Sequence, residues 1–184
     1  MIIASQVDIS KALLIDGWMS ERELTWLANT AKNCNIIVEF GSFKGRSTRA
    51  LADNSPDSCK IFAIDPWTGI YPNVIPPIST FVLPEFKNNL KEYIKSGKVI
   101  PRRMYSDSFT LSDKVKADMI FIDGDHSYEG VSVDIAKAIS LLNPSGILCG
   151  HDYDIVNWPG TVKAVTTYLG EVSVEDTIWH TRKF

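Results

Sequence analysis

Acidic residues and histidines follow two short apolar runs of the sequence. The run 119–122 leads into Asp123 and His126, and the run 146–149 leads, after one glycine, into His151 and Asp152. Short apolar runs of this kind are typical of strands that are covered on both faces of a parallel sheet. The carboxyl ends of such strands open at one edge of the sheet, about 4.8 Å apart for neighbours, so Asp123 and Asp152 could bind one ion between them. Mg²⁺ prefers carboxylate oxygens, whereas a ligand such as His151 shifts the preference toward Mn²⁺, Fe²⁺ or Zn²⁺.

Other interpretations of this acid–histidine cluster stay open. Any one of its acids could simply cap a following helix, and His126 could be an ordinary turn residue. The concentration of acids and histidines at two strand ends nevertheless favours a site. A metal-dependent phosphoesterase is disfavoured, because the sequence has no early Asp-x-His ligand pair and its only further histidine is His180.

A glycine loop is the second feature that could do chemistry. The run 36–38 leads into Glu39, and the glycines Gly41 and Gly45 follow before a helix opens near residue 48. Glycines permit a tight turn and a close approach of a ligand to the backbone, and a helix start offers free N–H groups. Asp65 ends the next apolar run, 20 positions beyond Gly45, where an acid can accept hydrogen bonds from both hydroxyls of an adenosine ribose.

The spacing of this loop argues against a dinucleotide site. Its pattern is G-x-x-x-G, whereas dinucleotide-binding proteins carry G-x-G-x-x-G to accommodate a pyrophosphate. The carboxylate of Glu39 suits an amine-bearing or cationic ligand and opposes a diphosphate. An NAD-dependent oxidoreductase is therefore disfavoured.

The glycine loop resembles that of the class I S-adenosylmethionine-dependent methyltransferases, in residues 38–48 (VEFGSFKGRST) and 64–67 (IDPW). The resemblance implies that Asp65 binds the ribose hydroxyls, and by position Ser106 and Asp107 are expected beside the adenine. It also implies that the amino-acid end of the cofactor is lined by Glu39, Gly41, Ser42 and Ser47. Four further residues are assigned to the cofactor pocket on the same resemblance: Phe43, Gly45, Trp67 and Asp123.

The acid–histidine cluster resembles the metal-dependent O-methyltransferases of the catechol and caffeoyl-coenzyme A type. It is closer to the group that includes macrolide-sugar O-methyltransferases and the cephalosporin-biosynthesis methyltransferase, in residues 121–130 (FIDGDHSYEG), 150–153, 15–19 and 177–179. The resemblance implies a divalent cation, Mg²⁺ or another, on Asp123, His151 and Asp152, with His151 where the group usually has an acid. It also implies that His126 is the catalytic base, acting on a hydroxyl of a small-molecule or sugar acceptor.

The elements that must position these residues alternate between strands and helices. Strands are expected at 36–38, 61–64, 99–100, 119–122, 146–149, 171–174 and 177–181, and helices at 20–32, 48–52, 85–95, 131–142 and 161–169. Such alternation indicates parallel βαβ units, but the last two strands are too close for a crossover helix and should pair antiparallel. The predicted fold is α/β, a Rossmann-like doubly wound, mostly parallel seven-stranded sheet with an antiparallel C-terminal hairpin.

The length of 184 residues fits a single methyltransferase domain over residues 1–184. Residues 1–32 are expected to form an N-terminal helical cap. Residues 66–86, which hold five of the nine prolines, are expected to form a lid loop. Because little else remains to cover the site, we expect a small acceptor or an exposed terminal group, unless a partner subunit supplies more of the site.

The composition excludes several classes of partner. With 45% hydrophobic and 22% charged residues and a net charge of −3, the chain resembles ordinary globular proteins and has no general attraction to nucleic acid or anionic membranes. Three scattered cysteines and the lack of a signal peptide predict a cytoplasmic location. A homo-oligomer stays open, as do two other functions: a metal-independent methyltransferase on another acceptor, and a non-catalytic small-molecule-binding protein that retains the fold.

Overall fold

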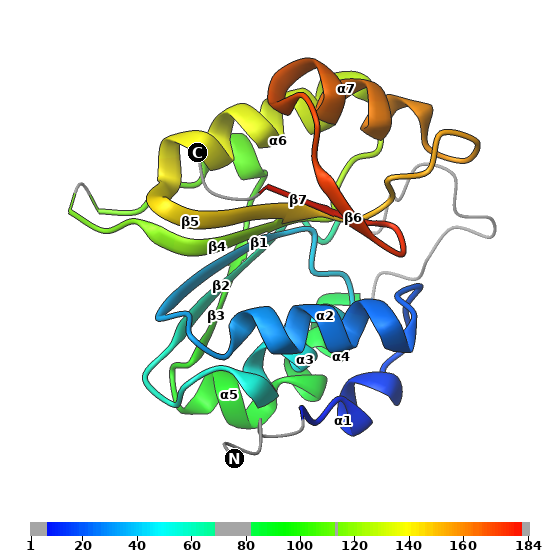
Figure 1. Cartoon of the computed structure of the whole chain (residues 1–184). Coiled ribbons are helices and arrows are strands. Elements are labelled where there is room, and N and C mark those ends of the chain that lie inside the picture. Colours follow the sequence, from blue (N-terminus) through cyan, green and yellow to red (C-terminus); the bar gives the residue numbers. More distant parts are fainter. Residues whose placement is uncertain (1–6, 69–81, 113, 182–184) are drawn as a thin grey trace, which may run out of the picture.

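The computed structural model describes residues 7–68, 82–112 and 114–181. Within these residues, a sheet of seven strands has the order β3-β2-β1-β4-β5-β7-β6 (Figure 1). The strands are β1 (Ile36–Phe40), β2 (Lys60–Asp65), β3 (Val99–Arg103), β4 (Ala117–Ile122), β5 (Leu142–Gly150), β6 (Ser173–Glu175) and β7 (Ile178–His180). Along this order, the neighbours β3–β2, β2–β1, β1–β4 and β4–β5 pair in parallel, and β7 pairs antiparallel with β5 and β6. The predicted fold is confirmed.

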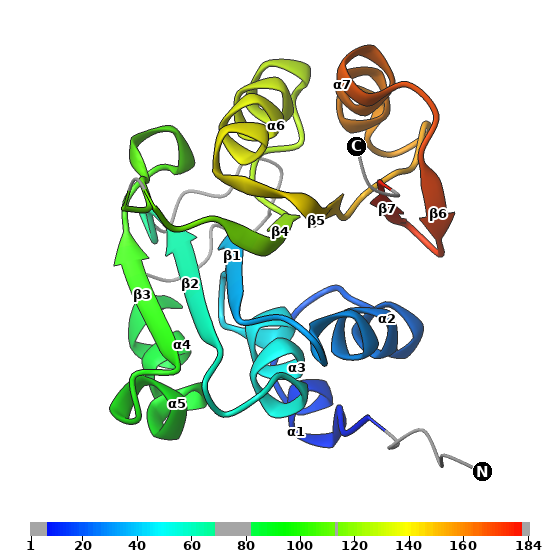
Figure 2. The same ribbon diagram turned by 60° about the vertical axis from the view of Figure 1, so that its left-hand side comes forward.

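Helices cover both faces of this sheet (Figure 2). One face carries α1 (Ser10–Leu13), α2 (Glu21–Ala31), α3 (Arg46–Asn54), α4 (Val82–Asn89) and α5 (Lys91–Lys95). The other face carries α6 (Tyr128–Leu141) and α7 (Pro159–Leu169), and a 3₁₀ turn, Ser106–Ser108, follows β3. None of the helices in the described part of the chain has the length and apolar character that a membrane span requires.

The central strands carry apolar side chains on both faces because the sheet has a core on each side. Side chains alternate between the two faces of a strand. Ile37 and Met119 therefore pack on the side of α1–α5, whereas their neighbours Val38 and Ile120 pack against α6 and α7. All four side chains are fully buried. This double packing holds the strand ends, and the polar residues that follow them, in fixed positions.

The predicted helix 85–95 is two helices in the structure, α4 and α5, which meet at Leu90. Leu90 leaves the helical conformation (φ −110°, ψ 16°) and is fully buried. Its side chain lies against the glycine loop, where a Cβ on Gly45 would be 2.4 Å from its Cδ2. Because α4 begins at Val82, residues 82–86 of the predicted lid loop are helical, and residues 69–81 lie outside the described residues.

The N-terminal segment is bound to the glycine loop. Helix α2 begins at the predicted capping box, in which Ser20 and Glu23 exchange both hydrogen bonds. Ahead of it, Asp16 forms an ion pair of 2.9 Å with Lys44, and the Arg46 guanidinium donates to the carbonyl oxygen of Ile15 over 2.7 Å. The segment ahead of α2 therefore lies next to the glycine loop at the carboxyl edge of the sheet.

Candidate active site

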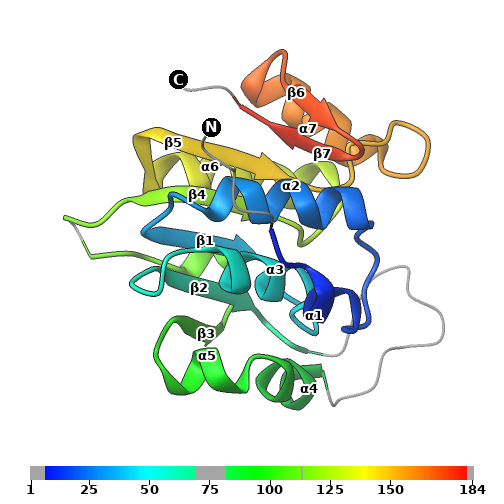
Figure 3. The ribbon, with the colours of Figure 1, turned by 60° about the horizontal axis from the view of Figure 1, so that its bottom comes forward.

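The predicted site residues lie at or just beyond the carboxyl ends of β1 to β5, around the point where the strand order reverses at β1. Ligands of doubly wound folds bind at this point. The connection between α1 and α2 and the loop after β5 lie beyond the same edge (Figure 3). The edge therefore brings together the glycine loop, the acid–histidine cluster and the N-terminal segment.

Gly41 allows the glycine loop to pass next to the end of β4. Its φ is +85°, and a Cβ there would lie 2.0 Å from the carbonyl oxygen of Asp123. The Gly41 amide donates to Ile64 over 2.8 Å, and the Asp123 amide donates to Phe40 over 2.7 Å. The glycine loop and the acid–histidine cluster are thus direct neighbours, which sequence spacing alone did not establish.

Glu39, at the end of β1, organises the glycine loop from inside. Its side chain is fully buried. The hydroxyls of Ser42 and Ser47 each donate to the carboxylate over 2.6 Å, and the Thr48 hydroxyl donates as well. Burial raises the pKa of Glu39 to about 7, although these three hydroxyls favour the charged form. A ligand amine would reach Glu39 only by displacing one of them.

Glu39→Gln is expected to flatten the pH dependence of the free energy of unfolding between about pH 4.5 and 7. The folded chain keeps the Glu39 proton up to about pH 7, whereas the unfolded chain releases it near the ordinary pKa of 4.5. The contribution of Glu39 to stability is therefore full below about pH 4.5 and is lost as the pH rises toward 7. One pKa unit corresponds to about 1.4 kcal/mol, so the effect amounts to a few kcal/mol.

Urea denaturation at several pH values measures this effect. Glu171→Gln serves as the control. Glu171 is exposed, so the free energy of unfolding of this variant should depend on pH as that of the wild type does. Parallel curves for Glu39→Gln and the wild type would contradict the burial argument.

Asp65 anchors both the glycine loop and the segment that follows β2. It is 2% exposed. Its Oδ2 accepts the amides of Ser42 and Phe43 over 3.0 and 2.9 Å, and its Oδ1 accepts the amide of Trp67 over 2.6 Å. Burial raises the pKa of Asp65 in spite of these donors. The Trp67 indole N–H also donates to the Phe43 carbonyl over 2.8 Å. Four predicted cofactor residues thus come together, namely Asp65, Ser42, Phe43 and Trp67.

The two residues expected beside the adenine, Ser106 and Asp107, have different surroundings. Ser106 is half-buried, and its hydroxyl hydrogen-bonds the carboxylate of Asp134, whereas Asp107 is exposed. Asp134 is buried in α6, and burial raises its pKa to about 6. Asp134 was not among the predicted site residues, although an acid three residues after Val131, on the apolar stripe of that helix, was a usable signal.

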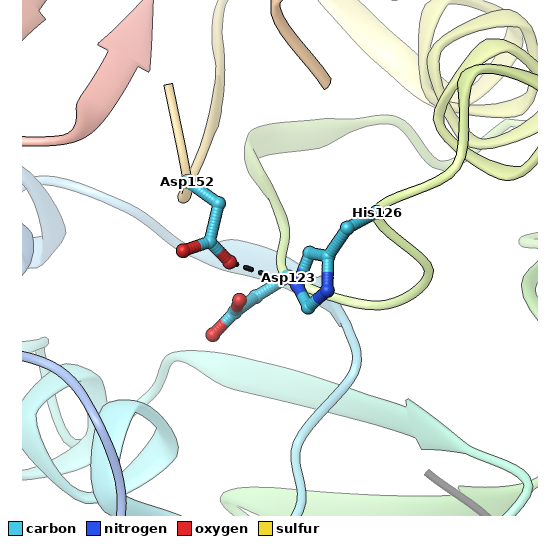
Figure 4. Close-up of side chains that lie close together, drawn as sticks. All are labelled: Asp123, His126 and Asp152. Atoms are coloured by element: carbon cyan, nitrogen blue, oxygen red, sulfur yellow. Dashed lines mark ion pairs between the residues drawn. The ribbon is translucent and has the colours of Figure 1, made fainter. Parts of the chain in front are cut away.

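The acid–histidine cluster comes together at the ends of β4 and β5. Asp123, His126 and Asp152 each offer a ligand atom, and these atoms lie within 4.8 Å of one another (Figure 4). This group contains His126, the expected base, and not His151, the expected ligand. Nε2 of His126 is 2.8 Å from Oδ2 of Asp152. Nδ1 of His151 is 3.2 Å from Oδ1 of Asp152 and 3.6 Å from Oδ1 of Asp123. Asp125 stays outside this group, because its carboxylate accepts the Ser127 amide.

The two histidines of the cluster differ in environment. The His126 side chain is 29% exposed and the His151 side chain 8%. Burial lowers the pKa of both, but neighbouring carboxylates outweigh it, so that the pKa of His126 is raised and that of His151 rises to about 12. Conversely, the two histidines hold the pKa of Asp152 below its usual range, although burial opposes this. Asp152 also has a left-handed backbone (φ +62°), a strained conformation that often marks functional sites.

Two residues that the sequence analysis did not place in the site contact these histidines. Glu23 of α2 is 3% exposed, and its Oε1 lies 3.1 Å from Nε2 of His151. Hydrogen bonds and His151 lower the pKa of Glu23 to about 2 against the opposing effect of burial. The Trp158 ring lies 4.2 Å from that of His126 between centroids. The capping box identified Glu23 as a helix residue but carried no sign of this second contact.

The doubly wound sheet closed by an antiparallel β7, with a G-x-x-x-G loop where the strand order reverses, is the Rossmann-like fold of methyltransferases. Residues 38–153, more than half of the chain, match the family model described as Methyltransferase domain. The chain belongs to this family.

Individual relatives are distant. The uncharacterized protein R132 of Acanthamoeba polyphaga mimivirus is 28% identical over 155 residues, 79% of this chain and 65% of that protein. An S-adenosylmethionine-dependent O-methyltransferase of Thermotoga maritima has a TM-score of 0.65 at 15% identity, over 86% of this chain and 55% of that one. The O-methyltransferase TomG of Streptomyces achromogenes, which is involved in tomaymycin synthesis and was solved with S-adenosylmethionine, has a TM-score of 0.66 at 13% identity, over 91% and 82%.

These likenesses to solved structures show the fold. The chain spans less than two thirds of the length of the mimivirus and Thermotoga proteins.

Proposed function

We propose that this chain transfers the methyl group of S-adenosylmethionine to a hydroxyl group of a small molecule or sugar, with the help of a divalent cation. The observation that carries the proposal is the contact between the glycine loop and the acid–histidine cluster, where Gly41 packs on the backbone of Asp123. A cofactor held at the loop would present its reacting end to the cluster. Membership of the methyltransferase domain family supports methyl transfer.

The residues of the cluster fit a divalent cation. Nδ1 of His151 lies 3.2 and 3.6 Å from the carboxylate oxygens of Asp152 and Asp123. Atoms that share one ion at about 2.0–2.3 Å have similar spacing. Two carboxylates and an imidazole suit Mn²⁺, Fe²⁺ or Zn²⁺, and carboxylates also suit Mg²⁺. We assign Asp123, His151 and Asp152 as the ligands.

His126 is the base of the proposed reaction. It is the more exposed of the two histidines, so an acceptor hydroxyl can reach it. Oδ2 of Asp152, 2.8 Å from Nε2, keeps a proton on Nε2 and stabilises the imidazolium that forms when Nδ1 takes the proton of the acceptor hydroxyl. A histidine paired in this way can hold a proton near neutral pH.

The remaining residues of the chain bind and orient. S-adenosylmethionine supplies an electrophilic methyl group on its sulfonium, and a bound divalent cation would lower the pKa of a hydroxyl beside it. The glycine loop and Asp65 hold the cofactor, Asp123 and Asp152 place the acceptor side of the site, and Trp158 shields one side of His126. Positioning of this kind supplies a large part of the rate of an in-line transfer.

Calorimetric titration with S-adenosylmethionine and with NAD tests the cofactor. We expect S-adenosylmethionine to bind and NAD to give no heat of binding. Preferential binding of NAD would overturn the proposal in favour of an oxidoreductase. Binding of neither would favour a non-catalytic protein that retains the fold.

Exhaustive chelation is expected to abolish transfer of a labelled methyl group to a hydroxylated acceptor, because it removes the cation between Asp123 and Asp152. Added Mn²⁺ or Mg²⁺ should restore the transfer. The assay uses a panel of catechols and sugars, with amines as the contrasting class. Activity that survives chelation would remove the cation from the proposal, and label on amines only would remove the hydroxyl.

The cytoplasmic location and homo-oligomeric state stay predictions.

A further inference from the structure

Glu23 connects helix α2 to the end of β5. Its Oε2 accepts the Ser20 amide over 2.7 Å, which is one half of the capping box. Its Oε1 accepts the Thr177 hydroxyl over 2.6 Å and lies 3.1 Å from Nε2 of His151. The carboxylate is almost fully buried. It therefore touches α2, the turn between β6 and β7, and the acid–histidine cluster at once.

We infer that Glu23 is a positioning residue for the proposed cation site: its carboxylate orients the His151 ring so that Nδ1 faces Asp123 and Asp152. The two ring nitrogens have opposite surroundings, since Nδ1 faces the two candidate ligand carboxylates and Nε2 faces Glu23. Within the described residues, Nε2 has no other polar partner and no hydrogen bond of regular geometry. The inference rests on the proposed function, because it assigns His151 as a ligand.

The chemistry of metal-ligating histidines supports this role. Such a histidine usually directs its second ring nitrogen to a carboxylate or carbonyl, which fixes the tautomer and the ring orientation. Glu23 supplies a carboxylate on that side of His151 and keeps the proton on Nε2. Nδ1 is then the nitrogen left for a cation beside Asp123 and Asp152.

A glutamine at position 23 can keep the helix cap but cannot satisfy His151. Capping boxes accept Gln as well as Glu. Among the described residues, the groups that face the Glu23 carboxylate direct donors at it, namely the Ser20 amide, the Thr177 amide and hydroxyl, and the His151 ring. The amide group of Gln would therefore point a donor at one of these donors. Glu23→Gln thus separates the role toward His151 from the role in the helix.

The test is the affinity of the purified full chain for Mn²⁺ alone, measured by electron paramagnetic resonance. We expect Glu23→Gln to bind Mn²⁺ about 10- to 100-fold more weakly than the wild type. Ser20→Ala is the matched control, because it removes the reciprocal half of the capping box and leaves Glu23 and His151 in place. Ser20→Ala should bind Mn²⁺ as the wild type does. Thermal unfolding of all three proteins reports their stability.

Three outcomes overturn the inference. If Glu23→Gln binds Mn²⁺ as tightly as the wild type, Glu23 has no positioning role, and the proposed function stands. If Ser20→Ala loses as much affinity as Glu23→Gln at a similar loss of stability, the effect belongs to the helix. If the wild type binds no Mn²⁺, the cation part of the proposed function fails, and the inference fails with it.

A measurement on the wild type covers the case in which Glu23→Gln does not fold. In nitrogen-15 spectra of the His151 ring, added Zn²⁺ should shift the Nδ1 signal and leave Nε2 protonated. A shift of Nε2, or loss of its proton, would show that the ring binds through the side that faces Glu23 and would overturn the inference.

Discussion

Asp65→Ala is expected to lower the affinity for S-adenosylmethionine by at least about 100-fold in calorimetric titration. The carboxylate accepts the amides of Ser42, Phe43 and Trp67, in addition to the bonds expected with the ribose. A hydrogen bond to a charged group is worth about 1.5–3 kcal/mol, and about 1.4 kcal/mol is tenfold in binding. Removal of the carboxylate releases the glycine loop and the segment after β2, so the cofactor pocket loses two of its walls.

A ligand without ribose hydroxyls separates the two roles of Asp65. If the carboxylate binds these hydroxyls, the substitution and their absence remove the same interaction, and the losses are not additive. Asp65→Ala should then weaken a 2′,3′-dideoxy analogue of S-adenosylhomocysteine less than it weakens S-adenosylhomocysteine itself. Equal losses for the two ligands would limit Asp65 to holding the loop.

Asp118→Ala is the matched control for Asp65→Ala. Asp118 also accepts two backbone amides, those of Asn35 and Ile36 over 2.7 and 3.1 Å, but at the amino end of β1. We expect its substitution to leave the affinity for S-adenosylmethionine unchanged. Unchanged affinity in Asp65→Ala would remove that residue from the cofactor site. Equal losses in the two variants would trace the effect to general stability.

The meeting of Asp123 and Asp152 could be predicted because it follows from strand order. Asp123 and Asp152 follow the carboxyl ends of β4 and β5, which are parallel neighbours in the sheet, and Ile122 lies opposite Gly150. Covered parallel strands are recognisable as apolar runs, and their carboxyl ends share an edge. The same reasoning placed Asp65 next to the glycine loop, whose Gly41 amide bonds to β2.

Contacts that depend on helix packing could not be predicted in this way. Glu23 reaches His151 because α2 packs beside β7, and Ser106 reaches Asp134 because α6 covers the turn after β3. No local pattern encodes the distance between such segments. Likewise, the break at Leu90 results from packing against Gly45, not from a helix-breaking residue. The acids at the strand ends could therefore be predicted from the sequence, whereas the residues that contact the histidines of the site depend on tertiary packing and could not.

His126→Ala is expected to lower kcat by about 100- to 10,000-fold, the usual contribution of a general base, for the acceptor found by labelled-methyl transfer. The affinity for S-adenosylmethionine should stay unchanged, because His126 lies at the end of β4 and outside the hydrogen bonds of the glycine loop and Asp65. If His126 is the base, the residual activity of the variant should rise with pH, since hydroxide can replace the missing imidazole. Initial rates across a pH series measure this.

The affinity for Mn²⁺ decides which histidine is base and which is ligand, because both lie within reach of Asp152. With the roles proposed, His126→Ala keeps Mn²⁺ binding and loses turnover, whereas His151→Gln loses both. The buried His151 faces Asp123 and Asp152 through one nitrogen and Glu23 through the other, whereas the more exposed His126 faces Asp152 and the Trp158 ring. Loss of Mn²⁺ binding in His126→Ala with retention in His151→Gln would exchange the two roles. Full turnover in His126→Ala would leave the reaction without a base among the histidines of the cluster.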